Sequence, residues 1–113
     1  METSAAAAAL SALGHEPRLK VFRLLVRAGP TGISAGDVAR QAGVLQNTLS
    51  SYLSALSHAG LVTSRREGRS VIYMADYAHI AGLLDYLVAD CCEGDPGAFC
   101  PVLEKMGRPP SGG

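Results

Sequence analysis

The three cysteines of this chain fall within one ten-residue stretch and are Cys91, Cys92 and Cys100. Three cysteines scattered at random over 113 residues would gather this closely only roughly a few per cent of the time, so the cluster indicates a shared role. Thiolates select soft centres, and arsenic(III) takes three sulfur ligands in a pyramid with a lone pair in the remaining direction. The three cysteines, with no histidine close by, therefore favour a thiol site for As(III).

The spacing of the cluster also has a geometric consequence. Adjacent residues on a helix point about 100° apart, so Cys91 and Cys92 converge only where a helix ends. Such a break is expected from the residues between the pair and the third cysteine, namely Gly94, Pro96 and Gly97. The chain can then fold back and bring Cys100 to the pair at a modest loop-closure cost.

Other uses of these thiols stay open. A peroxide sensor needs an exposed thiolate, but here the end of a helix and nearby carboxylates favour the protonated thiol; those carboxylates are Asp90, Glu93 and Asp95. Neutral arsenous acid condenses with protonated thiols and releases water. A site that keeps its thiols protonated therefore impairs arsenite binding less than it impairs reaction with peroxide. The carboxylates would also attract cadmium or lead, and one of them could supply the fourth ligand that structural zinc normally takes. Cys91 could also be a small interface hydrophobe.

The elements that would carry this site begin with two helices. Ser4 is expected to cap an Ala-rich helix that closes at Gly14, with two large apolar residues, Leu10 and Leu13. Pro17 opens a second helix, which ends at Gly29. One apolar stripe of that helix is expected to be buried, and it comprises Leu19, Phe22, Leu25 and Val26.

Two more helices form a helix-turn-helix pattern. Ser34 and Asp37 resemble a capping box for a short third helix that Gly43 closes. A fourth helix, over about residues 46–59, is expected to bury Leu49, Leu53 and Leu56. Its other face carries amide and hydroxyl side chains, which reach base edges and phosphates without burying a charge. The residues expected to read DNA bases are Gln46, Asn47, Thr48, Ser50 and Ser51.

After Gly60 the pattern alternates, which predicts two strands over residues 61–66 and 69–75 joined by a Glu67-Gly68 turn. This hairpin is expected to act as a wing whose cations grip DNA phosphate, and they are Arg65, Arg66 and Arg69. The formal net charge of the chain is zero, but residues 15–70 hold eight basic and three acidic side chains, a local charge of +5. Residues 76–104 hold six acids and no lysine or arginine, so the cationic region is partitioned from the acidic one.

A fifth helix is expected after Asp76, which would cap it. Apolar residues recur along it at helical spacing, at Ile80, Leu83, Leu84, Leu87, Val88 and Cys91. So wide a stripe on a terminal helix suggests a partner. With the thin first helix it predicts a homodimer whose half-sites lie one DNA turn apart.

The sequence also predicts the domain organisation and the general class of the protein. Residues 1–106 read as one mostly α domain with a β-hairpin and an inducer site at 91–100, and the Pro/Gly/Ser-rich residues 107–113 read as a disordered tail. Apolar runs are too short for a membrane span, and Glu2 without a basic start does not fit a secretory leader, so a cytoplasmic protein is expected. The sequence lacks a carboxylate pair, a Ser/His/Asp set and a glycine-rich phosphate loop, so no enzyme is expected.

One stretch resembles a known family. Residues 44–53, then Leu56, residues 59–62 and the Arg66-Glu67-Gly68-Arg69 run resemble the winged-helix repressors of the ArsR/SmtB family, over about residues 8–92. The resemblance implies a winged helix-turn-helix homodimer, joined through its first and fifth helices, that releases double-stranded operator DNA on binding a metal or metalloid. Tyr52 stands where a histidine is frequent. Leu45 stands where a serine often caps the recognition helix, so we expect Asn47 to serve in part as the cap.

Sensor sites differ within this family. The arsenic-sensing type with cysteines in the third helix is not matched, because residues 33–38 contain none. A zinc-type site on the fifth helix is matched only in part. His79 and Glu93 lie at the spacing of zinc ligands, but Tyr77 and Asp90 stand where a carboxylate and a histidine would be expected. The three cysteines are instead similar to those of arsenite-responsive members with thiols at the end of the last helix. The resemblance thus implies an arsenite-responsive repressor; whether Sb(III) competes stays open.

Overall fold

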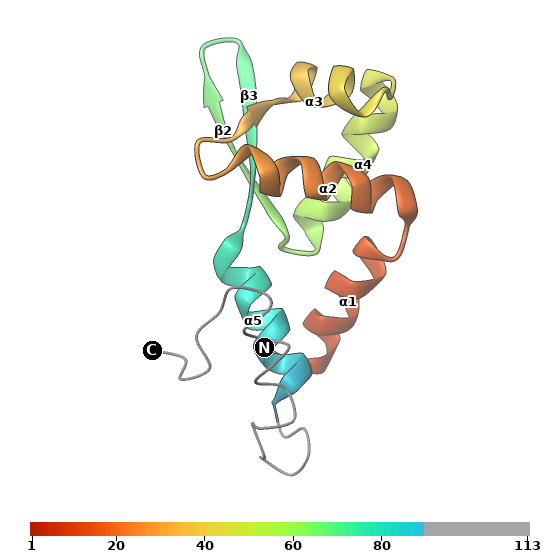
Figure 1. The fold of residues 1–113 in the computed structure, drawn as a ribbon, viewed down its shortest axis with the longest axis vertical. Coiled ribbons are helices and arrows are strands. Elements are labelled where there is room, and N and C mark those ends of the chain that lie inside the picture. The colour runs from red at the N-terminus through yellow and green to blue at the C-terminus, as the bar shows by residue number, and fades with distance from the viewer. Residues whose placement is uncertain (90–113) are drawn as a thin grey trace. The chain divides into compact units, whose positions relative to one another are not determined.

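The computed structural model describes residues 1–89, and within them the chain forms five helices and three strands (Figure 1). The helices are α1 (Thr3–Leu13), α2 (Glu16–Ala28), α3 (Ala35–Ala42), α4 (Gln46–His58) and α5 (Tyr77–Val88). The strands are β1 (Ile33–Ser34), β2 (Val62–Glu67) and β3 (Ser70–Ala75). The chain divides into two compact units, Met1–Leu83 and Leu84–Gly113, and of the second only residues 84–89 are described. The domain boundary expected at 106 and the expected tail lie outside the described residues.

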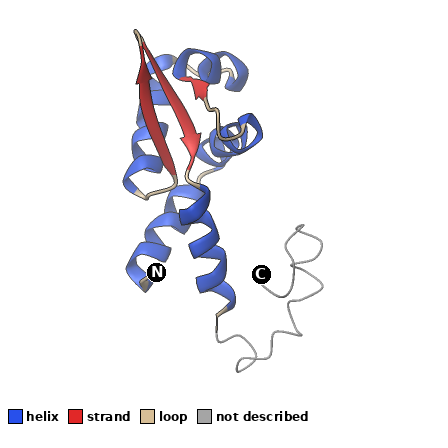
Figure 2. Cartoon of the chain, turned by 90° about the vertical axis from the view of Figure 1, so that its left-hand side faces the viewer, coloured by secondary structure: helices blue, strands red, loops and turns tan. Residues whose placement is uncertain are grey.

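The sheet is antiparallel, with strand order β1-β3-β2. Figure 2 shows β2 and β3 running side by side as a hairpin. Their register pairs Val62 with Ala75 and Glu67 with Ser70, so the loop is Gly68-Arg69, one residue later than expected. Gly68 has a φ of 61°, a conformation that glycine adopts without strain, and this places it first in the loop. The strand β1 was not expected, because two residues carry no alternating pattern.

The core lies where α2 meets its neighbours, because α2 contacts α1, α3, α4 and β3. The largest fully buried side chains are Leu25, Leu49, Leu56, Leu61, Val21 and Val38. The expected buried face of α4 is confirmed, since Leu49, Leu53 and Leu56 are all buried. The expected stripe of α2 is wrong at two positions, because Leu19 and Val26 are 39% and 40% exposed. The buried face includes Val21 instead, which lies beside the end of α3 and the turn that follows it.

The helix α1 packs through alanines. It buries Ala6, Ala9 and Ala12, while Leu10, one of its two large apolar residues, is 44% exposed. Small side chains at this spacing let the helix backbone approach α2 and α4 closely. Ser4 lies inside the helix, whose N-cap is Glu2 with no side-chain cap bond, so the Ser4 cap is also wrong. The helix does end at Gly14, as expected.

The starts of α3 and α5 are capped by the side chains expected from the sequence. Ser34 Oγ accepts a hydrogen bond from the backbone N–H of Asp37 at 3.2 Å, which confirms the cap of α3. The Asp37 carboxylate pairs with Arg40, so the capping box is only half formed. Asp76 Oδ1 accepts from the N–H of His79 at 3.0 Å, which confirms the cap of α5. Within residues 1–89, no helix has both the length and the apolar character needed to cross a bilayer.

Candidate nucleic-acid interface

The helix α4 presents a polar face to solvent on a firmly held scaffold. Its apolar side chains are buried, and Gly43, with a φ of 69°, ends α3 and turns the chain into α4. Four of the expected base-reading side chains are exposed on the first turns of α4, namely Gln46, Asn47, Ser50 and Ser51. Thr48 is half-buried beside Leu49 and is the least accessible of the set. The structure therefore brings the expected base-reading residues together on one end of one helix.

The start of α4 departs from a well-capped helix. Its N-cap is Leu45, which makes no side-chain cap bond and is 74% exposed. Asn47 Oδ1 accepts a hydrogen bond from the backbone N–H of Thr48 at 2.9 Å. The expectation that Asn47 supplies part of the missing cap is confirmed, because one otherwise free N–H of the first turn is satisfied. The sequence pattern of polar side chains did not indicate this exposed leucine at the start of α4.

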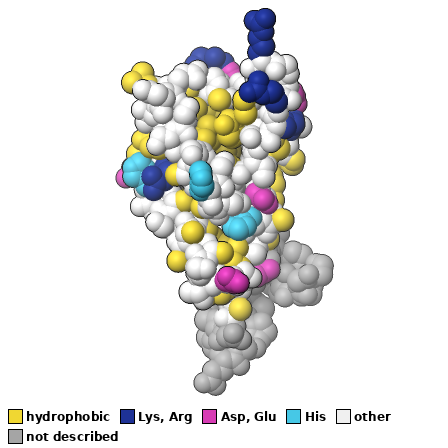
Figure 3. All heavy atoms as spheres, turned by 180° about the vertical axis from the view of Figure 1, so that it is seen from behind, with side chains coloured by type: hydrophobic (Ala, Val, Ile, Leu, Met, Phe, Trp, Pro, Cys, Tyr) yellow, Lys and Arg dark blue, Asp and Glu magenta, His cyan; other side chains and the backbone are white. Residues whose placement is uncertain are grey.

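The wing carries two free cations. Arg66 and Arg69 are exposed, and within residues 1–89 neither makes a hydrogen bond or ion pair through its side chain. Arg69 lies in the loop itself, and Arg66 lies on β2, two residues before the first loop residue, Gly68. Figure 3 shows lysine and arginine side chains gathered mainly at the wing end of one face. Such a concentration gives a positive potential that attracts phosphate.

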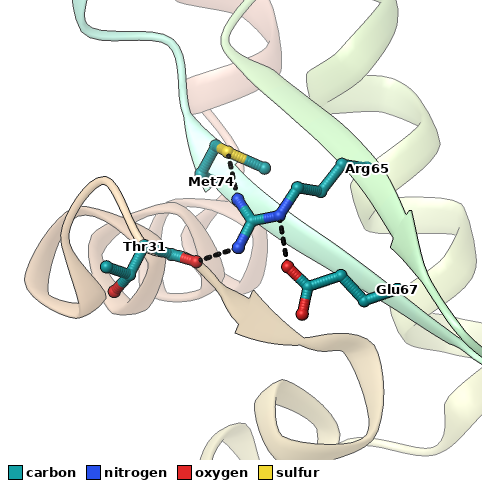
Figure 4. Close-up of polar contacts among 4 residues, drawn as sticks. All are labelled: Thr31, Arg65, Glu67 and Met74. Atoms are coloured by element: carbon teal, nitrogen blue, oxygen red, sulfur yellow. Dashed lines mark hydrogen bonds and ion pairs between the residues drawn. The ribbon is translucent and has the colours of Figure 1, made fainter.

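Arg65 differs from these two, because its guanidinium is already bonded within the chain (Figure 4). Its Nε donates to Glu67 Oε2 at 2.6 Å and its Nη2 donates to the carbonyl oxygen of Thr31 at 2.7 Å. Its Nη1 lies 3.5 Å from the Sδ of Met74. The structure thus separates Arg65 from the two free arginines, a distinction that sequence alone did not reveal.

The predicted inducer site lies elsewhere in the chain. Cys91, Cys92 and Cys100 lie outside the described residues, as does Glu93. In the described part of the chain, no three histidine, cysteine or acidic side chains gather as a metal site would require. His79 packs against Gly60, and its Nε2 is buried with no hydrogen-bond partner among residues 1–89. His79 as a whole is half-buried, so only this end of its ring is enclosed.

A cavity of about 670 Å³ opens between α2 and the turn that links α3 to α4. Apolar side chains of Val21, Leu24 and Val44 line it, and Lys20 and Arg27 stand at its polar side. Lys20 is paired with Glu16 at 3.5 Å. None of the residues expected to bind DNA or an inducer lines this cavity.

Comparison with known proteins identifies the family. A helix-turn-helix domain family matches residues 13–65. The biofilm growth-associated repressor of Xylella fastidiosa is 33% identical over 83 residues, which span 74% of this chain and 70% of that protein. An ArsR-like transcriptional regulator from Rhodococcus superposes with a TM-score of 0.71 at 25% identity, covering 93% of this chain and 94% of the other. The chain belongs to the ArsR/SmtB family.

A second ArsR/SmtB relative is similar to this chain over only part of its own length. The regulator NmtR of Mycobacterium tuberculosis is 38% identical over 79 residues, which cover 70% of this chain and 63% of NmtR. This chain therefore spans less than two thirds of NmtR, whereas the superposition on the Rhodococcus regulator covers 93% of this chain. The winged helix-turn-helix fold expected from the sequence is therefore confirmed, together with the family.

Proposed function

We propose that this ArsR-family chain is a transcriptional repressor that binds double-stranded operator DNA as a homodimer and releases it when As(III) is bound by Cys91, Cys92 and Cys100. The observation that supports DNA binding is the exposed polar face of α4 above its buried leucines. In this proposal, side chains on that face read bases, and they are Gln46, Asn47, Thr48, Ser50 and Ser51. Arg66 and Arg69 on the wing contact phosphate.

The homodimer is supported by apolar side chains left exposed on α1 and α5. Leu10 of α1 is 44% exposed and Leu87 of α5 is 47% exposed. A Mycobacterium bovis protein described as a homodimeric winged helix-turn-helix domain superposes with a TM-score of 0.61 at 28% identity. The superposition covers 81% of this chain and 85% of that protein. A two-fold dimer would bury each exposed leucine in both copies and set the recognition helices one DNA turn apart.

As(III) as inducer is supported by the chemistry of the three thiols. A putative arsenical resistance operon repressor of Halobacterium salinarum is 41% identical over 59 residues, 52% of this chain and 49% of that protein. A probable mercury resistance operon repressor of Streptomyces lividans is 28% identical over 95 residues, 84% of this chain and 72% of that protein. These two names concern arsenic and mercury, which thiols bind strongly. Sb(III) shares this chemistry and is expected to act at the same cysteines.

Binding of As(III) would act on DNA through α5. Three sulfur bonds to one arsenic atom would constrain the residues that follow this helix and so change the dimer interface that α5 is proposed to form. The spacing of the two recognition helices would then change, and the coupling between the two sites would be of the usual size, about 1–3 kcal/mol.

The experiment that tests this proposal is an arsenite titration followed by operator release, using an operator selected in vitro with the native protein. We expect arsenite to weaken operator binding, and a Cys91→Ser, Cys92→Ser, Cys100→Ser variant to bind the operator normally and ignore arsenite. Release of DNA by arsenite from the triple variant would show that the cysteines are not the site.

The alternative inducers are tested in the same assay. A thiol redox sensor of the same fold would release DNA with peroxide or persulfide and form a disulfide visible by mass, without arsenite. A repressor for cadmium, lead or zinc would respond to the divalent cation at lower concentrations than to arsenite. If arsenite is the weakest of these effectors, the As(III) assignment is wrong while the repressor function stands.

A further inference from the structure

We infer that Arg65 is a positioning residue that fixes the wing relative to the helix-turn-helix, and that it does not contact phosphate. This inference rests on the proposed binding of DNA. It replaces the role that the charge of Arg65 suggested in the sequence, because the guanidinium has partners on each side within the protein. The free cations for DNA are then Arg66 and Arg69.

The first support is that the Arg65 side chain joins β2 and β3 to the segment that leads into β1. It starts on β2, passes the Sδ of Met74 on β3, and reaches the carbonyl oxygen of Thr31, two residues before β1 (Figure 4). Glu67, on the same face of β2, accepts from Nε and neutralises the guanidinium locally. A planar guanidinium can bond in several fixed directions at once, whereas a lysine ammonium cannot match that pattern.

The second support is the position of Arg65 in the sheet. Arg65 pairs with Ile72, and Ile72 pairs with Ser34 on β1, so these residues form a row across three strands. Beyond that row β1 has ended, and the wing continues as two strands through Arg66 to the Gly68-Arg69 loop. Arg65 therefore holds the hairpin at the last row where a third strand supports it.

The third support is that the anchor at Thr31 is itself fixed to the helix-turn-helix. Gly32, which follows Thr31, has a φ of 82° and packs so closely on β3 that a Cβ would lie 2.9 Å from the carbonyl oxygen of Tyr73. Ser34, two residues later, caps α3, the helix that precedes the recognition helix. A bond from Arg65 to Thr31 thus ties the wing to the body that carries α4.

A salt titration of operator binding separates positioning from phosphate contact. Removing one phosphate-binding cation lowers the slope of log Kd against log salt by about 0.9. We expect Arg66→Ala and Arg69→Ala each to lower the slope in this way. We expect Arg65→Ala and Arg65→Lys both to weaken operator binding about three- to tenfold with the native slope, because DNA must then order a looser wing.

Arg65→Lys is the decisive variant, because lysine keeps the charge but loses the bridge. Native affinity in Arg65→Lys, together with a lowered slope in Arg65→Ala, would show that Arg65 grips phosphate and would overturn the inference. Native affinity and slope in both variants would also overturn it. A native protein without any salt-dependent DNA binding would instead contradict the proposed function.

A second measurement needs no DNA. We expect nitrogen relaxation at the amides of Gly68 and Arg69 to show greater mobility in Arg65→Lys and Arg65→Ala, while the amides of α2 and α4 are unchanged. Arg66→Ala is the matched control, since it removes a neighbouring cation without side-chain partners among residues 1–89 and should leave the loop as it is. An unchanged loop in both Arg65 variants would refute the positioning role.

Discussion

At the residue scale, two neighbouring arginines on one strand have different surroundings. Arg65 and Arg66 project to opposite faces of β2. On the face of Arg65, the guanidinium meets the carbonyl oxygen of Thr31 and the Sδ of Met74. Sequence could predict that both are cationic and near the wing tip. It could not predict that the Arg65 guanidinium is hydrogen-bonded within the protein. Thr31 is 34 residues away along the chain and lies near Arg65 only because β1 pairs with β3.

Gly32 offers a residue-scale prediction. Gly32→Ala would combine a strained φ of 82° with a Cβ at 2.6 Å from Ile72 Cγ2 and 2.9 Å from the Tyr73 carbonyl oxygen. We expect a loss of about 3 kcal/mol in the free energy of unfolding, measured by urea denaturation.

Gly43→Ala is the matched control for Gly32→Ala. Gly43 has a φ of 69° but no heavy atom of residues 1–89 within 4 Å of a built Cβ. It should lose only about 1 kcal/mol, from the backbone conformation alone. Equal losses in the two variants would show that the close approach to β3 contributes nothing.

At the element scale, periodicity and capping residues predicted most helices, and packing partners decided the exceptions. The leucines of α4 recur at helical spacing, so its buried and exposed faces could both be predicted from sequence. The face of α2 could not, because Val21 and Leu19 are equally apolar and only the positions of α3 and α4 decide between them. The buried alanines of α1 were missed because a small side chain gives a weak apolar signal.

The start of α4 offers an element-scale prediction. Leu45→Ser supplies a hydroxyl that can accept a bond from a free N–H of the first turn, which Leu45 does not do. We expect the free energy of unfolding to rise by about 1 kcal/mol, read from thermal denaturation. Leu45→Ala is the control, and it should gain little because it removes the leucine without adding a cap. A Leu45→Ser variant no more stable than Leu45→Ala would contradict the role of the cap.

At the scale of the whole molecule, the sequence predicted the winged helix-turn-helix fold, which the superposed structures confirm. The separation of positive from negative charge stays a prediction, because four of the six acids counted in residues 76–104 lie outside the described residues. The three cysteines that carry the inducer proposal lie outside the described residues, so the support for that site is the chemistry of the thiols. The exposed leucines on α1 and α5 support the dimer.

The proposed dimer gives a molecule-scale prediction. Leu87→Glu would place a carboxylate in the proposed interface, once in each copy. We expect dimerisation to weaken by about a hundredfold or more, because an unpaired charge is costly to bury, and sedimentation velocity would then show a monomer. Leu45→Glu is the control, since Leu45 is exposed outside α1 and α5 and its variant should stay a dimer. A dimeric Leu87→Glu protein would place the interface elsewhere.

The end of β1 at Ser34 has a practical consequence for engineering. Past the Arg65, Ile72 and Ser34 row, the hairpin pairs with no third strand among residues 1–89, so its loop is a modular tip. Longer or differently charged loops could be grafted between Glu67 and Ser70 while the domain keeps its native framework. Under the proposed function, such a graft would change the affinity for nucleic acid while the choice of sequence stays with α4.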